Sequence, residues 1–156
     1  MSDNLTITLD RKSYMSMMMA LSNLKDIEKT DAVKQGMSAG AAVIRRETAK
    51  NMRQRVQVRK GNLKKSLTRK TTVKKKEPRA YIGFKRPSGA ASHLIDKGTK
   101  DRWTKGKNGK PRMFRGKVTP RLFHTESFER KKEEAVKVMT KYIQIGISRI
   151  TSRRYY

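Results

Sequence analysis

Two basic blocks restrict which parts of this chain can form a core. The first block runs from Lys50 to Lys76 and contains no acid. Its basic residues are Lys50, Arg53, Arg55, Arg59, Lys60, Lys64, Lys65, Arg69, Lys70, Lys74, Lys75 and Lys76. The second runs from Lys97 to Arg121 and contains ten Lys or Arg and one acid, Asp101. Because a buried unpaired charge is costly, these segments are expected to stay solvated until an anionic or complementary partner orders them.

The composition predicts one domain, residues 1–156, with a small core. Only 35% of the residues are hydrophobic, 34% are charged, and the net charge is +27. Such a charge opposes compaction and favours acidic or polyanionic partners. The chain has no Cys, which excludes disulfides and thiolate metal sites and is compatible with assembly in a reducing cytoplasm.

The N-terminal residues predict a soluble protein with no membrane partner. Met1 to Asn4 lack the basic and apolar regions of a signal peptide. The longest apolar-rich run, from Met15 to Leu21, is far shorter than the roughly 20 residues that span a bilayer.

The first part of the chain predicts a strand followed by two helices. Leu5, Ile7 and Leu9 alternate with polar residues, which predicts a strand over 4–10. A helix then follows Ser13, with one face made of Tyr14, Met17, Met18, Leu21 and Leu24. Core packing is the favoured role for these methionines, and an adaptable partner surface is the alternative.

The second helix is predicted over 31–52, capped by Thr30 or Asp31. Its middle is unusually small-sided, with Gly36, Ala39, Gly40, Ala41 and Ala42. Small residues allow another backbone to approach closely, and packing against the protein's own sheet is favoured over a subunit contact.

The middle of the chain predicts an extended connection, a helical turn and a hairpin. Gly61 and Asn62 supply turn chemistry, and Leu63 and Leu67 are spaced as on a helix. Residues 71–73 and 80–84 are rich in β-branched and aromatic residues, which is typical of paired strands.

Two apolar anchors flank the second basic block. Leu94 and Ile95 can bury, and Gly98 offers the positive φ that ends a strand or a helical turn. Residues 99–120 are expected to form a protruding loop without regular structure, because Gly106, Gly109, Pro111 and Gly116 interrupt it. Pro120, Leu122 and Phe123 then return the chain to apolar surface.

A long amphipathic helix is predicted over 125–149, capped by Thr125 or Ser127. It carries Phe128 on its apolar face and is expected to pack on a sheet, because no heptad order is sustained. Residues 150–156 are expected to form a tail.

The sequence gives no indication of an enzyme. His93 and His124 have no acid or cysteine at ligand spacing, so both are expected to be packed or hydrogen-bonded rings. The segment from Gly106 to Pro111 lacks the spacing and the Ser or Thr of a phosphate-binding loop. No catalytic, cofactor or metal residue is therefore assigned.

Nucleic-acid contact, if present, is expected to be electrostatic. The two basic blocks can neutralise phosphates without reading bases. Trp103, Phe114 and Tyr81 place aromatic rings among the cations, where they could stack on single strands. No helix-turn-helix, zinc-finger or ribonucleoprotein motif is present. The alternative is an exposed arm that only solubilises the chain.

The order of several short motifs resembles the neck family of tailed bacteriophages, small proteins that join head to tail. The motifs are Leu94-Ile95, Gly98-Thr99, a basic glycine-rich loop, Pro120-x-Leu122-Phe123 and a C-terminal amphipathic helix. The segment from Gly61 to Leu67 matches a Gly-x-Leu-x-x-Ser-Ile turn of that family. This chain has Lys97 where family members usually carry an acid.

Taken together, these elements predict an α+β fold. We expect an antiparallel or mixed sheet of about four strands packed against helices, with a long C-terminal helix and extended basic loops. The resemblance implies a ring of identical subunits, six in number, between the portal-side head-closure connector and the tail terminator or tail tube. The genome would pass through this ring, so double-stranded DNA is a further expected partner, and the protein would be located in the virion neck.

Candidate contact residues and structural anchors follow from this interpretation. The contact candidates are Arg53, Arg55, Arg59, Lys60, Lys64, Lys65, Arg102, Trp103, Lys105, Lys107, Lys110, Arg112 and Arg115. The structural anchors are Leu94, Ile95, Gly98, Pro120, Leu122, Phe123 and Phe128. The main alternative function is a basic protein that coats DNA without sequence preference, and a ribosome-associated protein fits the two amphipathic helices less well.

Overall fold

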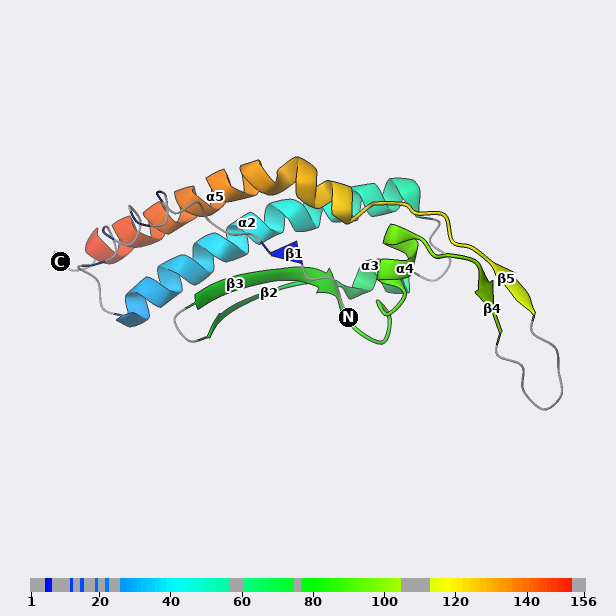
Figure 1. Ribbon diagram of the computed structural model, residues 1–156. Helices are drawn as coiled ribbons and strands as arrows, with labels where there is room; N and C mark the ends of the chain where they lie inside the picture. Colours follow the sequence, from blue (N-terminus) through cyan, green and yellow to red (C-terminus); the bar gives the residue numbers. More distant parts are fainter. Residues whose placement is uncertain are drawn as a thin grey trace.

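The structure, a computed structural model, describes residues 5–6, 12, 15, 19, 22, 26–56, 61–74, 77–104 and 113–152. Two long helices lie over a small sheet, and a thin two-stranded ribbon projects from one end of this body (Figure 1). The elements are β1 (Leu5–Thr6), α2 (Asp26–Arg55), α3 (Asn62–Ser66), β2 (Leu67–Lys74), β3 (Glu77–Phe84), α4 (Ser92–Lys97), β4 (Arg102–Trp103), β5 (Phe114–Gly116) and α5 (Thr125–Ser152). The fold is therefore α+β, as predicted.

In the described part of the chain, the sheet of the body has three antiparallel strands in the order β1, β3, β2. The predicted hairpin is confirmed, with β2 and β3 paired from Leu67 opposite Phe84 to Lys74 opposite Glu77. The expected single sheet of about four strands is not confirmed, because among the described residues β4 and β5 pair with each other in a separate sheet. These short strands belong to the basic segment, which has too few apolar residues to extend the core.

Helix α2 forms the middle layer of the body (Figure 1). One side of α2 packs on the sheet, and its other side packs along α5. The main hydrophobic cluster draws on all three layers and comprises Met37, Ala41, Ile44, Leu67, Ala80, Ile82, Ala135, Met139 and Ile143. The prediction that the last helix packs on a sheet is therefore wrong, since its apolar face is covered mainly by another helix.

Two glycines let α2 and α5 approach closely. A Cβ atom on Gly40 would lie 2.7 Å from the backbone oxygen of Ala135, and one on Gly36 would lie 2.7 Å from the backbone oxygen of Met139. Towards the start of α2, Ala32 contacts Gly146 of α5, so the two helices run antiparallel. The small-sided stretch of α2 is thus used for a helix of the same chain, in addition to the sheet that was expected.

The helix boundaries extend beyond the predicted ones. Helix α2 begins at Asp26, so Thr30 and Asp31 lie inside it and are not its caps. Its last turn carries Arg53 and Arg55, whose charges favour a helix C-terminus. Helix α5 continues to Ser152, which shortens the predicted tail; residues 153–156 lie outside the described part.

Some predictions at the N-terminus lie outside the described residues. Of the strand expected over 4–10, only β1 is described, and it pairs with Ile82 and Tyr81 of β3. The apolar residues of the helix expected after Ser13 lie outside the described part. The neighbouring Met15 and Met19 are 53% and 75% exposed.

The helical turn after Gly61 is confirmed as α3, but Leu67 already belongs to β2. Residues 57–60, which were expected to be extended, lie outside the described residues. Within the part of the chain that the structure describes, none of the helices has the length and hydropathy that a membrane crossing requires.

Candidate interaction surface

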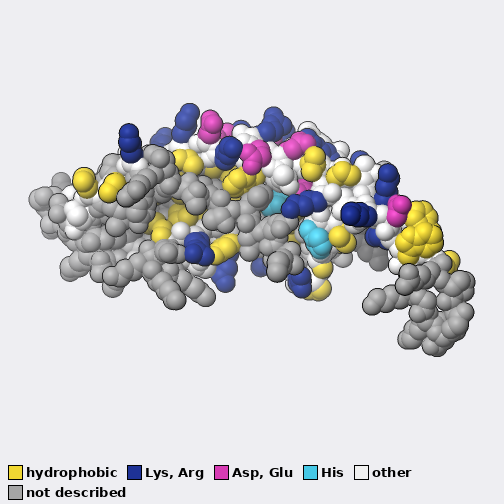
Figure 2. All heavy atoms as spheres, viewed as in Figure 1, with side chains coloured by type: hydrophobic (Ala, Val, Ile, Leu, Met, Phe, Trp, Pro, Cys, Tyr) yellow, Lys and Arg dark blue, Asp and Glu magenta, His cyan; other side chains and the backbone are white. Residues whose placement is uncertain are grey.

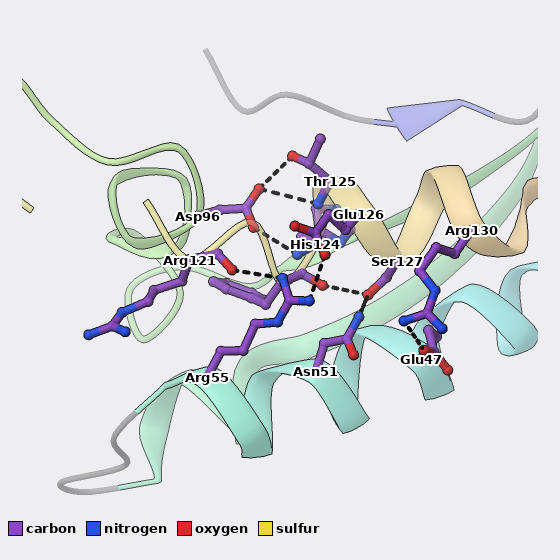
Figure 3. Close-up of polar contacts among 11 residues, drawn as sticks. Glu47, Asn51, Arg55, Asp96, Arg121, His124, Thr125, Glu126, Ser127 and Arg130 are labelled. Atoms are coloured by element: carbon purple, nitrogen blue, oxygen red, sulfur yellow. Dashed lines mark hydrogen bonds and ion pairs between the residues drawn. The ribbon is translucent and has the colours of Figure 1, made fainter. Parts of the chain in front are cut away.

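The basic segment from Lys97 to Arg121, here called the arm, is closed at its base by Asp96. This residue is the one buried residue of α4 and is only 5% exposed. Its Oδ1 accepts a hydrogen bond from the backbone N–H of His124 at 2.7 Å. Its Oδ2 accepts from the N–H and the hydroxyl of Thr125, at 3.3 and 2.6 Å (Figure 3). The residue just before the arm therefore binds the residues just after it.

Backbone hydrogen bonds reinforce this closure. The N–H of Leu122 donates to the carbonyl oxygen of Asp96 at 2.9 Å, and the N–H of Arg121 donates to that of Ile95 at 3.1 Å. Gly98 has φ 76, and a Cβ there would lie 2.8 Å from the backbone oxygen of Val118. The predicted role of Gly98 at the end of α4 is therefore confirmed, and a side chain at this position would push the two sides of the arm apart.

The cap of α5 differs from the prediction. The carboxylate of Asp96, a residue distant in sequence, caps the N-terminus of α5 by accepting hydrogen bonds from the backbone N–H groups of His124 and Thr125. The hydroxyl of Thr125 also donates to Asp96 and is therefore not the cap. Ser127 is fully buried; its Oγ donates to the carbonyl oxygen of Phe123 and accepts from Asn51 Nδ2 at 2.8 Å. Ser127 therefore ties α5 to α2 and is not the cap that was expected.

We refer to Thr48, Asn51, Asp96, His124, Thr125 and Ser127 as the polar junction. It joins the second half of α2 to the start of α5 at the base of the arm, and Figure 3 labels all of its residues except Thr48. Within it, Thr48 Oγ1 lies 3.3 Å from Nδ1 of His124. Because buried polar groups are costly unless they are hydrogen-bonded, this network fixes one relative position of the two helices.

His124 is the least satisfied member of the polar junction. The residue is 8% exposed, and its Nε2 has no hydrogen-bond partner among the described residues. Burial lowers the pKa of His124 below the ordinary value of 6.5, although the negative charge of Asp96 and the backbone of Ile82 oppose the shift. The ring is therefore neutral at pH 7, and its protonation would place a charge in the junction.

A surface ion pair flanks the polar junction. Arg55 of α2 lies 2.6 Å from Glu126 of α5 and also donates to the carbonyl oxygen of Arg121 at 3.2 Å. The hydrogen bond from Arg55 lowers the pKa of Glu126. Arg55, which was predicted to contact a partner, therefore contacts its own chain at the point where the arm ends.

The sides of the arm form an antiparallel ribbon, which corrects the prediction of a loop without regular structure. Trp103 pairs with Phe114, and Arg102 pairs with Gly116 across a register shift. Thr104 donates its N–H to the carbonyl oxygen of Met113 at 2.9 Å, and its Oγ1 accepts from the N–H of Met113 at 2.8 Å. Gly116, expected to break regular structure, supplies the positive φ of 69 at the register shift.

The ribbon carries exposed apolar side chains. Trp103 and Met113 are each 59% exposed and Phe114 is 55% exposed; these three residues are the apolar arm patch. The Trp103 and Phe114 ring centroids are 5.0 Å apart. None of the three belongs to the hydrophobic core. Figure 2 shows hydrophobic side chains gathered at the projecting end of the molecule, beside atoms that are not described.

The other predicted contact residues fall into two groups. Arg53, Lys64, Lys65, Arg102 and Arg115 are exposed, as a contact role requires. Arg59, Lys60, Lys105, Lys107, Lys110 and Arg112 lie outside the described residues. The described part of the first basic block lies in α2, α3 and β2 of the body, whereas the ribbon that carries Arg102 and Arg115 projects away from it (Figure 1). The two blocks meet where Arg55 donates to the carbonyl oxygen of Arg121.

The predicted anchors are buried to different degrees. Phe123 is completely buried and lies edge-to-face against Phe84, with ring centroids 5.9 Å apart. Leu94, Ile95 and Phe128 are half-buried. Pro120 is exposed but lies next to Gly98, and Leu122 is 38% exposed with φ 48. Leu122 therefore contributes mainly through its backbone, at the turn into α5.

Sequence reasoning missed Asp96, Asn51, Thr48 and Met113. For Asp96 a signal was present, because it is an acid between an apolar pair and Gly98, immediately before a strongly basic segment. Asn51 gave no signal, since polar residues on a long helix are usually solvated, whereas Thr48 falls at the helical spacing of Ala41 and Ile44 and could be placed on the buried face but not in a polar network. Among the described residues, no cluster of three or more His, Cys, Asp or Glu could hold a metal ion.

The comparisons with known proteins identify one family. A family model described as "Bacteriophage HK97-gp10, putative tail-component" matches residues 16–98, more than half of the chain. The matched segment includes α2, the β2–β3 hairpin and α4, and it ends where the arm begins. No curated protein and no solved structure matches the chain.

Proposed function

Because the chain belongs to the HK97-gp10-like family of bacteriophage tail components, we propose that it is a neck protein that joins the DNA-filled head to the tail. In this proposal six copies form a ring around the DNA channel. The ring lies between the portal-side head-closure connector and the tail terminator or tail tube. The protein acts by assembly without catalysis and remains in the virion.

The projecting arm is the observation that supports this proposal most strongly. A two-stranded ribbon extends from a body whose own core is complete without it (Figure 1). The polar junction fixes the base of the arm through the buried Asp96. A connector must reach neighbouring rings while keeping its body in place, and a rigidly based extension meets both requirements.

Charge supports contact with acidic or phosphate-bearing neighbours. The net charge of each chain is +27, so a ring of copies requires anions close by. We expect the acidic surface of an adjoining ring, a neighbouring subunit or the DNA in the channel to supply them.

The experiment that tests this function removes the charge of the arm. Arg102, Lys105, Lys107, Lys110, Arg112 and Arg115 are replaced together by Ser, and purified variant is added to heads and tails made without the protein. We expect normal folding, measured by circular dichroism, and failure of heads to join tails, measured by electron microscopy. Normal joining with this variant would overturn the role of the arm.

A second candidate, non-specific DNA binding, is favoured by the charge of the sheet and its flanking turns. In the described segment 61–74 and 77–95, exposed cations are Lys64, Lys65, Arg69, Lys70, Arg79, Lys85 and Arg86. Side chains alternate between the two faces of a sheet, so Lys70 and its cross-strand partner Tyr81 lie on the face away from the buried Ile82. Cations and hydroxyls are typical of phosphate contacts.

A salt titration separates the two functions. A DNA-coating protein binds duplex tightly as a monomer or dimer in mild salt, with affinity that falls steeply as salt rises. A neck protein binds duplex weakly until it is assembled. Tight binding by the isolated chain would therefore favour the second candidate.

A further inference from the structure

The apolar arm patch is unexplained by the fold of the isolated chain. Trp103, Met113 and Phe114 are each more than half exposed on a ribbon that projects from the body. An aromatic side chain buries about 150–250 Å² when it is fully covered, so the exposed halves of the two rings leave a substantial apolar area in water. Large exposed apolar groups that are surrounded by polar residues mark interaction sites.

The surroundings of this patch are strongly basic. Lys100, Arg102, Arg115 and Lys117 are exposed on the two sides of the ribbon, and Asp101 is the one acid of the arm. Cations at the edge of an interface steer association and reject partners of like charge, whereas most of the binding energy comes from aromatic anchors. The partner surface should therefore combine an apolar pocket with an acidic rim.

A second copy of this chain fits that description poorly. The arm would need an acidic rim on that copy, and the chain has 13 acids against 40 basic residues. Most of its acids with described side chains are already used within the chain. They form ion pairs with Lys or Arg (Asp31, Glu47, Glu126, Glu129 and Glu134) or are buried (Asp96).

Nucleic acid also fits poorly. Duplex DNA presents phosphates outside its stacked bases, so it offers no apolar pocket for three large side chains. Single strands could stack on Trp103 and Phe114, but the two rings pack against each other, with centroids 5.0 Å apart and a tilt of 55° between their planes. Rings already packed together present less free face to a base.

We propose that the apolar arm patch is the anchor of the arm and that it docks into an apolar pocket with an acidic rim on a different virion protein. In this proposal Trp103 and Phe114 supply the affinity, and the cations around them select the acidic partner. The inference rests on the proposed neck function, because it names the chemistry of the neighbouring protein that the arm contacts.

The test uses Trp103 as its own probe, since it is the only tryptophan of the chain. The free protein should show the red-shifted, acrylamide-quenchable emission of an exposed indole. Addition of purified heads or purified tails made without this protein should shift the emission to shorter wavelength and protect it from acrylamide. The same measurement is made with increasing concentrations of the chain alone, with duplex DNA and with single-stranded DNA.

Substitutions identify which residues carry the binding. Trp103→Ala and Phe114→Ala are each expected to weaken co-sedimentation with heads or tails by about 30-fold, as for interface hot spots. The matched control is Tyr142→Ala, which removes an aromatic ring that is 43% exposed on α5 and should leave binding unchanged. All three variants should keep the thermal midpoint of the parent, because these rings lie outside the core.

Each alternative result overturns the inference. A blue shift with the chain alone would assign the patch to a second copy, and a shift with DNA but with neither heads nor tails would assign it to nucleic acid. No shift with any of these, or equal loss of binding in Tyr142→Ala, would also contradict it. If heads and tails join efficiently without any of this protein, the proposed function itself fails. If joining requires the protein but not Trp103 or Phe114, only the inference about the patch fails.

Discussion

Asp96, His124 and Thr125 of the polar junction flank the apolar arm patch in sequence, yet the side chains of the two regions are in opposite situations. In the junction, the carboxylate of Asp96 is buried and accepts three hydrogen bonds from His124 and Thr125. On the ribbon, Trp103 and Phe114 are apolar and more than half exposed. The chain thus buries polar groups where the arm begins and exposes apolar groups on the arm itself.

This difference indicates which interactions the chain makes alone and which it leaves for a partner. Buried hydrogen bonds and close helix packing stabilise the body before any assembly. Exposed aromatic rings contribute little to an isolated chain and much to an interface. Substitutions in the body should therefore change stability first, and substitutions on the ribbon should change assembly first.

The largest effect on stability is expected from Gly40→Val. The new side chain would meet the backbone oxygen of Ala135, which a Cβ alone would approach to 2.7 Å. Forcing α2 and α5 apart should cost about 3 kcal/mol of the free energy of unfolding, measured by urea titration. Arg46→Val is the control, because Arg46 is exposed and the change tests only the helix preference of Val, about 0.5 kcal/mol. Equal costs for the two variants would show that the helices do not depend on close approach.

A smaller loss is expected from Asp96→Ala. It removes the acceptor for the N–H groups of His124 and Thr125 and for the Thr125 hydroxyl. We expect a loss of about 2 kcal/mol in urea titration, because the buried donors are left without partners. Asp96→Asn keeps one acceptor oxygen and should recover part of this stability. Unchanged stability of Asp96→Ala would mean that the junction does not hold the base of the arm.

A pH effect is expected from His124. Its pKa is lower in the folded state than the ordinary 6.5, because burial disfavours the charged ring. Below pH 6.5 the unfolded chain therefore binds more protons, and the free energy of unfolding falls as the pH is lowered towards the folded-state pKa. Above pH 6.5 this contribution is fully present. Urea titrations between pH 7.5 and pH 5 measure it.

A matched pair of variants isolates that contribution. His124→Gln should reduce the loss of stability below pH 6.5, whereas His93→Gln should leave it unchanged, because His93 is exposed. The same pH dependence in both variants would assign the effect to other groups.

The smallest effect on overall stability is expected from Gly116→Ala. Gly116 has φ 69, and no neighbouring heavy atom lies within 4 Å of the position of the added Cβ. The strain should be about 1 kcal/mol and confined to the ribbon, so the thermal midpoint should not change. Faster amide exchange of Trp103 and Phe114 would show the local effect. A lower thermal midpoint would indicate that the ribbon is part of the cooperative core.

Local patterns in the sequence predicted much of the fold. The β-branched and aromatic residues near Ile82 predicted the hairpin, and Gly98 predicted the turn at the end of α4, because both depend on neighbours in the chain. The sequence correctly predicted the C-terminal helix α5, but the element on which it packs was predicted wrongly. An apolar helical face shows that something covers the helix, but the choice between sheet and helix depends on the glycines of α2.

The candidate site was less predictable for the same reason. Trp103 was identified as a contact residue from its place in a basic segment, but its pairing with Phe114 depends on a register that two short strands do not reveal. Asp96 caps a helix that begins beyond the whole arm. Capping rules consider residues adjacent to the helix end, so a cap supplied from a distant segment escapes them.

An electron cryo-microscopy reconstruction of the neck in the assembled virion tests the central claim most directly. The account predicts that Trp103 and Phe114 of each copy lie buried in an acid-rimmed pocket of a different polypeptide, while α2, α5 and the polar junction keep the arrangement described above. A reconstruction in which these two rings remain in solvent, or lie against another copy of this chain, would contradict it.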